Sequence, residues 1–198
     1  MKIADAKFAG SSTRVQQKPG RLLPEFAFIG RSNVGKSSLI NMLCRNGKLA
    51  MTSSTPGKTK VVNHFLVNDS WYLVDLPGHG YAKLGRKGRE ELADVVRDYI
   101  HNSEQMQSLF VLIDSRYDIV STDLDFIAEL GEYGIPFSII FTKCDKRGPN
   151  ALAAQIERDR EILSSDWEEL PRMFCSSSQT GMGRDEILDY IDSILKSL

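Results

Sequence analysis

The chain has 198 residues, of which 41% are hydrophobic and 26% are charged, and its formal net charge is −1. This length suits one domain with a sizeable core, and the ordinary composition excludes a disordered, collagenous or disulfide-stapled chain. The longest apolar runs, such as residues 109–113, are far shorter than the about 20 residues of a membrane helix, so we expect no membrane partner. The start of the chain shows no apolar stretch typical of a signal peptide, and three cysteines without a CxxC pair indicate reduced thiols in a cytoplasmic protein.

The charge is distributed unevenly along the chain. Residues 1–89 carry 15 Lys and Arg against 4 Asp and Glu, whereas residues 90–198 carry 10 against 22. A basic half indicates an anionic partner, and nucleic acid is the first candidate. The alternative is that these residues only balance bound phosphates and the acidic half of the chain.

Strand and helix patterns alternate along the chain. Residues 1–24 are basic and turn-rich, which indicates an N-terminal arm with room for one edge strand from Ala6 to Phe8, and residues 25–198 are expected to form a single domain. Strands are predicted at 26–29, 61–67, 71–74, 109–113, 137–141 and 173–175. Helices are predicted at 38–44, 90–100, 124–130, 151–163 and 187–195. This alternation predicts an α/β fold: a doubly wound, mostly parallel six-stranded sheet with one antiparallel hairpin, and helices on both faces.

A glycine-rich run follows the first buried strand and precedes the first predicted helix. It reads Gly30-Arg31-Ser32-Asn33-Val34-Gly35-Lys36-Ser37 and matches the pattern G-x-x-x-x-G-K-[ST]. Such a loop surrounds phosphate oxygens with backbone N–H groups and directs a helix N-terminus at them. Lys36 is expected to contact the β- and γ-phosphates, and the Ser37 hydroxyl is expected to bind Mg²⁺. The run and the next residue, Ser38, therefore predict nucleotide binding, because the flanking strand and helix make a chance match improbable.

A second motif, Asp75-Leu76-Pro77-Gly78, follows the strand at 71–74. An aspartate at the end of a strand can hold Mg²⁺ through a water molecule. The Gly78 N–H is free to bind a γ-phosphate oxygen, and loss of that oxygen would release the segment that follows. This motif therefore indicates how hydrolysis of a bound nucleotide could move the segment after Gly78.

A threonine-containing loop, Thr55-Pro56-Gly57-Lys58-Thr59, lies between the first helix and the strand at 61–67. Thr59 is the candidate second hydroxyl ligand of Mg²⁺, and Gly57 and Lys58 are expected near the phosphates. Two alternatives stay open: Thr55 is the ligand, or the loop is a Thr-rich turn without a metal.

Two further segments indicate which base is bound. Thr142-Lys143-Cys144-Asp145 follows the apolar strand at 137–141, and a carboxylate there can accept both N–H groups of guanine, which adenine lacks. Lys143 can lay its aliphatic stem on the ring. Ser176-Ser177-Ser178 follows the last strand and offers a backbone N–H to guanine O6. These segments favour GTP and GDP over ATP.

Taken in this order, the motifs resemble those of the translation-factor-related P-loop GTPases, and in finer detail the EngB (YihA/YsxC) family of bacterial GTPases. The resemblance extends to His79-Gly80-Tyr81-Ala82 and Asp114-Ser115-Arg116, and it spans the chain from about residue 6. It implies GTP hydrolysis, a role in assembly of the large ribosomal subunit and a link to cell division and septation. We further expect a monomer whose partner is a ribosomal large-subunit precursor, with its rRNA and proteins.

The catalytic candidates are Lys36, Thr59, His79 and Asn33. The family usually has Tyr where this chain has His79, and a histidine there can orient the attacking water or have no catalytic task. No Gln occupies this position, so unassisted hydrolysis should be slow, on the order of 10⁻⁴ to 10⁻² s⁻¹. Asn33 either helps to bind K⁺ or only braces the loop through side-chain hydrogen bonds.

Two other functions stay open from the sequence. One is a nucleotide-gated RNA- or ribosome-binding module without significant turnover. The other is a small ATP-dependent P-loop enzyme, although no motif for an acceptor pocket is present. The basic stretch at 83–89 is either a contact for RNA phosphates that GTP orders or a solvated loop.

Overall fold

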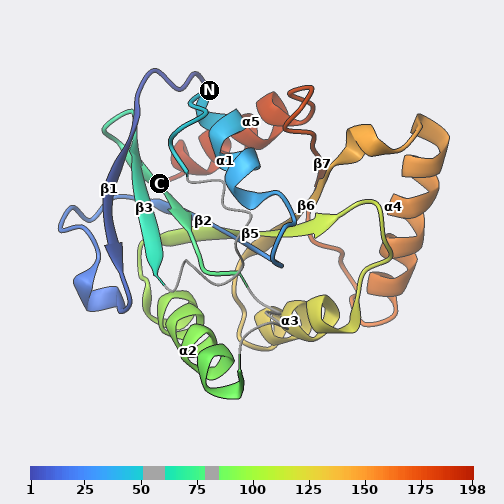
Figure 1. Ribbon diagram of the computed structural model, residues 1–198, viewed down its shortest axis with the longest axis horizontal. Helices are drawn as coiled ribbons and strands as arrows, with labels where there is room; N and C mark the ends of the chain where they lie inside the picture. The colour runs from blue at the N-terminus through green and yellow to red at the C-terminus, as the bar shows by residue number, and fades with distance from the viewer. Residues whose placement is uncertain (51–60, 79–84) are drawn as a thin grey trace.

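The computed structural model describes residues 1–50, 61–78 and 85–198, and it shows one sheet between two layers of helices (Figure 1). Its strands are β1 (Ala6–Ser12), β2 (Glu25–Gly30), β3 (Val62–Val67), β4 (Trp71–Asp75), β5 (Met106–Asp114), β6 (Phe137–Thr142) and β7 (Met173–Cys175). Its helices are α1 (Lys36–Cys44), α2 (Arg86–Asn102), α3 (Ser121–Glu132), α4 (Pro149–Ser164) and α5 (Arg184–Leu195), with short 3₁₀ helices η1 (Val15–Gln17) and η2 (Cys144–Lys146).

The strands of the described residues are ordered β1-β3-β4-β2-β5-β6-β7. β2 runs parallel to β4 and β5, and β6 runs parallel to β5 and β7, whereas β3 is antiparallel to both β1 and β4. The predicted α/β class is therefore confirmed, but the sheet has seven strands and not six. Most β1 side chains are half-buried or exposed and show no apolar alternation, so it is the backbone pairing of Ala6–Ser12 with β3 that makes this segment a strand.

Two apolar cores flank the sheet, one on each face. Phe26 and Phe28 of β2 point into the core under α1 and α5, whereas Ala27 and Ile29 point into the core under α2, α3 and α4. Figure 1 shows α1 and α5 on one side of the sheet and α2 and α3 on the other, with α4 at the right of the view. All of β2 is buried, as expected for a central parallel strand covered on both faces.

Several elements are longer than predicted. α2 begins at Arg86, so the second half of the basic stretch at 83–89 is helical, and Arg86 pairs with Glu90 one turn later. Asn68 and Asp69 in the β3–β4 hairpin both have positive φ, which Asn and Asp tolerate better than most residues. The three cysteines are free thiols, as predicted.

The described helices include none with the length and apolar character needed to cross a membrane. The parallel strands β2, β4, β5, β6 and β7 all end at the same edge of the sheet. In open parallel sheets, ligands bind beyond this carboxyl edge. The loops that follow these strands therefore define where the candidate site lies.

Candidate nucleotide-binding site

The loop from Gly30 to Ser37, here called the P-loop, joins the end of β2 to the start of α1. A Cβ added at Gly30 would lie 2.8 Å from Cγ1 of Val34 and 3.0 Å from Leu112, so only glycine fits there. Gly35 has a φ of +103°, a conformation that side chains disfavour. Asn33 also has positive φ, at 63°. This compact backbone places the N-terminus of α1, which has no acidic residue in its first turn, at the carboxyl edge of the sheet.

Lys36, the first residue of α1, forms an ion pair with Asp75, the last residue of β4. Strands β2 and β4 bring these residues together. Phe28 of β2 pairs with Asp75 of β4 in parallel register, and the P-loop that follows β2 leads to Lys36. Burial lowers the pKa of Lys36 to about 7, whereas the adjacent carboxylate favours the charged form. The two residues expected to handle phosphate and metal thus lie side by side, a contact that the sequence did not predict.

The groups near this ion pair suit a hard cation. Ser37 is half-buried in the first turn of α1, and its hydroxyl and the Asp75 carboxylate are the oxygen donors that Mg²⁺ prefers. In the part of the chain that the structure describes, no three His, Cys, Asp or Glu residues gather into a metal site. With one hydroxyl and one carboxylate from this part of the site, a bound Mg²⁺ would complete its octahedral shell with water and phosphate oxygens.

Some predicted site residues lie outside the described residues: Gly57, Lys58, Thr59 and His79. The first three residues after β4, Leu76, Pro77 and Gly78, are described and are buried. The Leu76 N–H donates to the Phe28 carbonyl over 3.0 Å, which keeps this segment next to the strand that leads into the P-loop.

The segment from Thr142 to Lys146, here called the base loop, begins at the last residue of β6 and contains η2. The Asp145 carboxylate accepts a 2.6 Å hydrogen bond from the Ser177 hydroxyl, and Lys146 Nζ lies 3.1 Å from its other oxygen. The bond from Ser177 holds the pKa of Asp145 below its ordinary value. The carboxylate is therefore ionised at neutral pH, as an acceptor for guanine N–H groups needs to be.

The serine loop, residues 176–183, follows β7 and packs against the base loop. The Ser176 N–H donates to the Phe141 carbonyl over 2.7 Å, and the Cys144 N–H donates to the Ser176 carbonyl over 3.1 Å. Gly183 closes this loop with a φ of +77°, and a Cβ there would lie 2.0 Å from the Cys175 carbonyl oxygen. The backbone thus fixes Ser177 and Ser178 beside the base loop.

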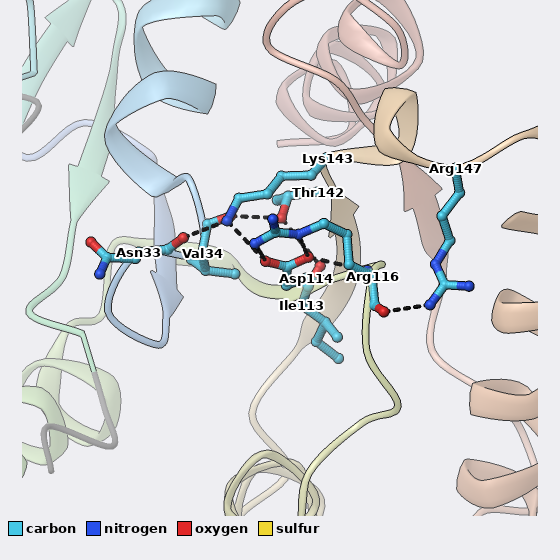
Figure 2. A network of polar contacts seen from close by, with 8 residues as sticks. All are labelled: Asn33, Val34, Ile113, Asp114, Arg116, Thr142, Lys143 and Arg147. Carbon is cyan, nitrogen blue, oxygen red and sulfur yellow. Dashed lines mark hydrogen bonds and ion pairs between the residues drawn. The ribbon is translucent and has the colours of Figure 1, made fainter.

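Two hydrogen bonds join the base loop to the P-loop (Figure 2). The Thr142 hydroxyl donates to the Val34 carbonyl over 2.7 Å, and the Lys143 ammonium donates to the Asn33 carbonyl over 2.7 Å. The side chain of Asn33 points away from this network in Figure 2. The phosphate-side and base-side candidates are therefore parts of one site, although they lie more than 100 residues apart.

Sequence reasoning gave no role to Asp114 or Arg116, which join this network. The Lys143 ammonium lies 2.8 Å from the Asp114 carboxylate, which also accepts two hydrogen bonds from the Arg116 guanidinium. Arg147 in turn donates to the Arg116 carbonyl. The signal that could have found Asp114 is its position, because it is an acidic residue at the carboxyl end of the strand beside β2.

The fold and the site define a P-loop nucleotide-binding protein. The family model described as "50S ribosome-binding GTPase" matches residues 25–143. The chain is 57% identical to the probable GTP-binding protein EngB of Bacteroides thetaiotaomicron, over 100% of this chain and 98% of the relative. It is also 57% identical to the EngB protein of Phocaeicola vulgatus, over 100% and 99%. The chain therefore belongs to the EngB family of GTP-binding proteins, a family of GTPases, as its motifs predicted.

The fold also matches a solved structure of a protein with the EngB name. A crystal structure of a probable GTP-binding protein EngB aligns with a TM-score of 0.63, at 23% identity, over 88% of this chain and 100% of that chain. At this level of identity the likeness supports the fold, whereas the family rests on the closer sequence relatives.

Proposed function

We propose that this protein binds GTP and GDP in the site described above, hydrolyses GTP slowly and acts as a switch in the assembly of the large ribosomal subunit. The observation that carries the proposal is the placement of Asp145. Ser177 holds its carboxylate, and Lys143 and Thr142 join its loop to the P-loop. A guanine base and its phosphates would therefore be held by one continuous unit in residues 25–198.

The proposed phosphate contacts come from the P-loop, from Ser38 and from the Asp75–Gly78 segment. Lys36 supplies positive charge, and Ser37, Thr59 and Asp75, the last through water, are the proposed Mg²⁺ ligands. When bound, Mg²⁺ would neutralise charge on the β- and γ-phosphates. Gly57 and Lys58 are proposed near the phosphates, and Cys144, Ser176, Ser177 and Ser178 complete the base side.

A low intrinsic rate is proposed because the residue after Gly78 is His79 and not Gln. His79 is a candidate for orienting water, and Asn33 is a candidate K⁺ ligand, with an exposed side chain that is directed away from the base loop (Figure 2). GTP turnover should be measured in matched K⁺ and Na⁺ buffers. Faster turnover in K⁺, lost in Asn33→Ala, supports the K⁺ role, whereas equal rates in both buffers remove it.

A ribosomal precursor is the proposed partner, in the cytoplasm and with the protein as a monomer. The basic half, residues 1–89, is the electrostatic support for an rRNA surface, and the family description supports a large-subunit particle. The link to cell division and septation is proposed from the family resemblance alone.

The test is co-sedimentation of the protein with large-subunit particles in the presence of a non-hydrolysable GTP analogue, GDP or no nucleotide. We expect most binding with the analogue. Equal binding in all three conditions would contradict a nucleotide switch. Single-turnover GTP cleavage with and without particles then separates a GTPase from a binding module, because a module without turnover cleaves no GTP in either condition.

A further inference from the structure

The Lys143 side chain crosses from the base loop to the P-loop (Figure 2). Its ammonium donates to the Asn33 carbonyl over 2.7 Å and to the Asp114 carboxylate over 2.8 Å. A Cβ built at Gly35 would lie 3.8 Å from Lys143 Cε, so the aliphatic stem passes close to the P-loop glycine. Both ends of this long side chain are therefore fixed, one by the backbone directly after β6 and the other by two oxygen acceptors.

Asp114 is positioned for this contact by the sheet. It ends β5, which lies between β2 and β6, and it pairs in register with Thr142. Its Oδ1 accepts from the N–H of Arg116 over 3.1 Å and from Arg116 Nε over 2.9 Å, and its Oδ2 accepts from a terminal guanidinium nitrogen over 2.8 Å. Such a bidentate ion pair fixes the plane of the carboxylate as well as its position.

The charge state of Asp114 suits the same role. Burial by itself would raise its pKa, but the hydrogen bonds from Arg116 and Lys143 outweigh burial and hold the pKa at about 2. The carboxylate therefore stays ionised at neutral pH and attracts the Lys143 ammonium. Arg147, next to η2, donates to the Arg116 carbonyl and ties the loop after β5 to the end of the base loop.

We propose that Asp114 is a positioning residue of the nucleotide site: its carboxylate, held by Arg116, keeps the Lys143 side chain extended across the P-loop in the conformation that covers the guanine base. A free lysine side chain samples many rotamers, and a side chain that is ordered before binding avoids that entropy cost when the ligand arrives. This inference rests on the proposed function, because it needs a guanine nucleotide in the site.

The test is the dissociation rate of a fluorescent GDP analogue, measured by stopped-flow displacement with excess GDP. Asp114→Asn keeps the size of the side chain and removes its charge. We expect dissociation to become about ten- to a hundredfold faster, the range for losing a charged hydrogen bond. Asp118→Asn is the matched control, because Asp118 lies in the loop that follows Asp114, its side chain is 67% exposed, and its carboxylate contacts Gln155 and Arg158 of α4 instead of Lys143. Its dissociation rate should equal that of the wild type.

A double-mutant cycle separates positioning from a general structural effect. If Asp114 acts through Lys143, Asp114→Asn has no further effect in a Lys143→Ala background, whereas a general loosening of the loop accelerates dissociation by the same factor in both backgrounds. Two results would overturn the inference: Asp114→Asn accelerates dissociation by the same factor in both backgrounds, or it does not accelerate dissociation in the wild-type background.

A replacement variant and the GDP binding of the wild type cover the remaining outcomes of this test. Should Asp114→Asn fail to fold, as judged by thermal unfolding, Arg116→Ala replaces it in the cycle; we expect a smaller acceleration that is again absent without the Lys143 ammonium. A wild-type protein that binds no GDP would overturn the proposed function together with this inference. If the wild type binds GDP normally but the effects of Asp114→Asn and Lys143→Ala on dissociation are additive, this inference alone is overturned.

Discussion

The hydroxyl of Ser177 donates a 2.6 Å hydrogen bond to the carboxylate of Asp145, across 32 positions of sequence. The same hydroxyl accepts from the N–H groups of Gln179 and Thr180, so it is oriented by its own loop before it reaches Asp145. One serine thus links the turn of the serine loop to the side chain proposed to read guanine.

Replacement of Ser177 by alanine should weaken GDP binding by roughly three- to tenfold, because Asp145 loses a hydrogen bond of about 1 kcal/mol. Isothermal titration calorimetry measures this change. Ser193→Ala is a suitable control, since that exposed hydroxyl of α5 donates to the Tyr190 carbonyl of its own helix. An unchanged affinity in Ser177→Ala would show that Asp145 does not depend on this donor.

The variant Asp145→Asn should weaken GTP binding by about a hundredfold, because one accepting oxygen becomes a donor that faces a guanine N–H. The same change should improve binding of xanthosine nucleotides, which present an oxygen at that position. Competition between guanosine and xanthosine diphosphates for one fluorescent probe measures both effects. A variant that keeps its preference for guanine would remove Asp145 from the base-reading role.

Lys36→Ala should reduce GTP affinity by at least about tenfold, since it removes a charge-assisted contact to the phosphates. It also leaves the buried Asp75 carboxylate without its cation, so we expect a lower thermal midpoint. Lys48→Ala, at an exposed position after α1, should change neither quantity. Full GTP affinity in Lys36→Ala would contradict the assignment of the P-loop.

Gly183→Ala should destabilise the protein by roughly 1–3 kcal/mol, because alanine disfavours positive φ. In addition, its Cβ would lie 2.0 Å from the Cys175 carbonyl oxygen. The resulting shift should also weaken nucleotide binding through Ser177. Gly148→Ala is the control, since a Cβ there meets no atom within 4 Å. Urea unfolding measures the difference, and equal stability of the two variants would argue against a steric requirement at 183.

Glu25 should make the free energy of unfolding depend on pH in the acid range. Burial by itself raises the pKa of Glu25, but hydrogen bonds from Ser103 and Tyr99 and the charge of Lys18 lower it from 4.5 to about 2. His64 Nε2 lies 3.7 Å from the carboxylate, beyond hydrogen-bonding distance, so we attribute the lowering mainly to the other three groups.

A carboxylate whose pKa is lowered by folding stabilises the protein above its unfolded pKa, and this contribution is lost as the pH falls toward the folded value. Between about pH 5 and 2 we therefore expect the free energy of unfolding to fall by up to about 3 kcal/mol from this group. Glu25→Gln should flatten this part of the profile, whereas Glu132→Gln, at an exposed position, should not. Urea unfolding at several pH values measures the slope, and identical slopes in wild type and Glu25→Gln would refute the assignment.

Sequence was sufficient for those features whose chemistry is local. The P-loop needs two glycines, a lysine and a hydroxyl at fixed spacing between a strand and a helix, and all of these are adjacent in the chain. The buried parallel strands were recognisable because both of their faces are covered, so their side chains are continuously apolar. The edge strand β1 has no such pattern, because its place in the sheet depends on backbone pairing with β3.

Only the tertiary structure decided which distant side chains meet. The Lys36–Asp75 ion pair, the Ser177–Asp145 hydrogen bond and the contact between Lys143 and Asp114 each join residues that follow or end different strands. The order and register of the strands set these distances, and no spacing within one segment encodes them. Motifs in the chain therefore named the family and the nucleotide, whereas the sheet determined how the base loop, the P-loop and Asp114 support one another.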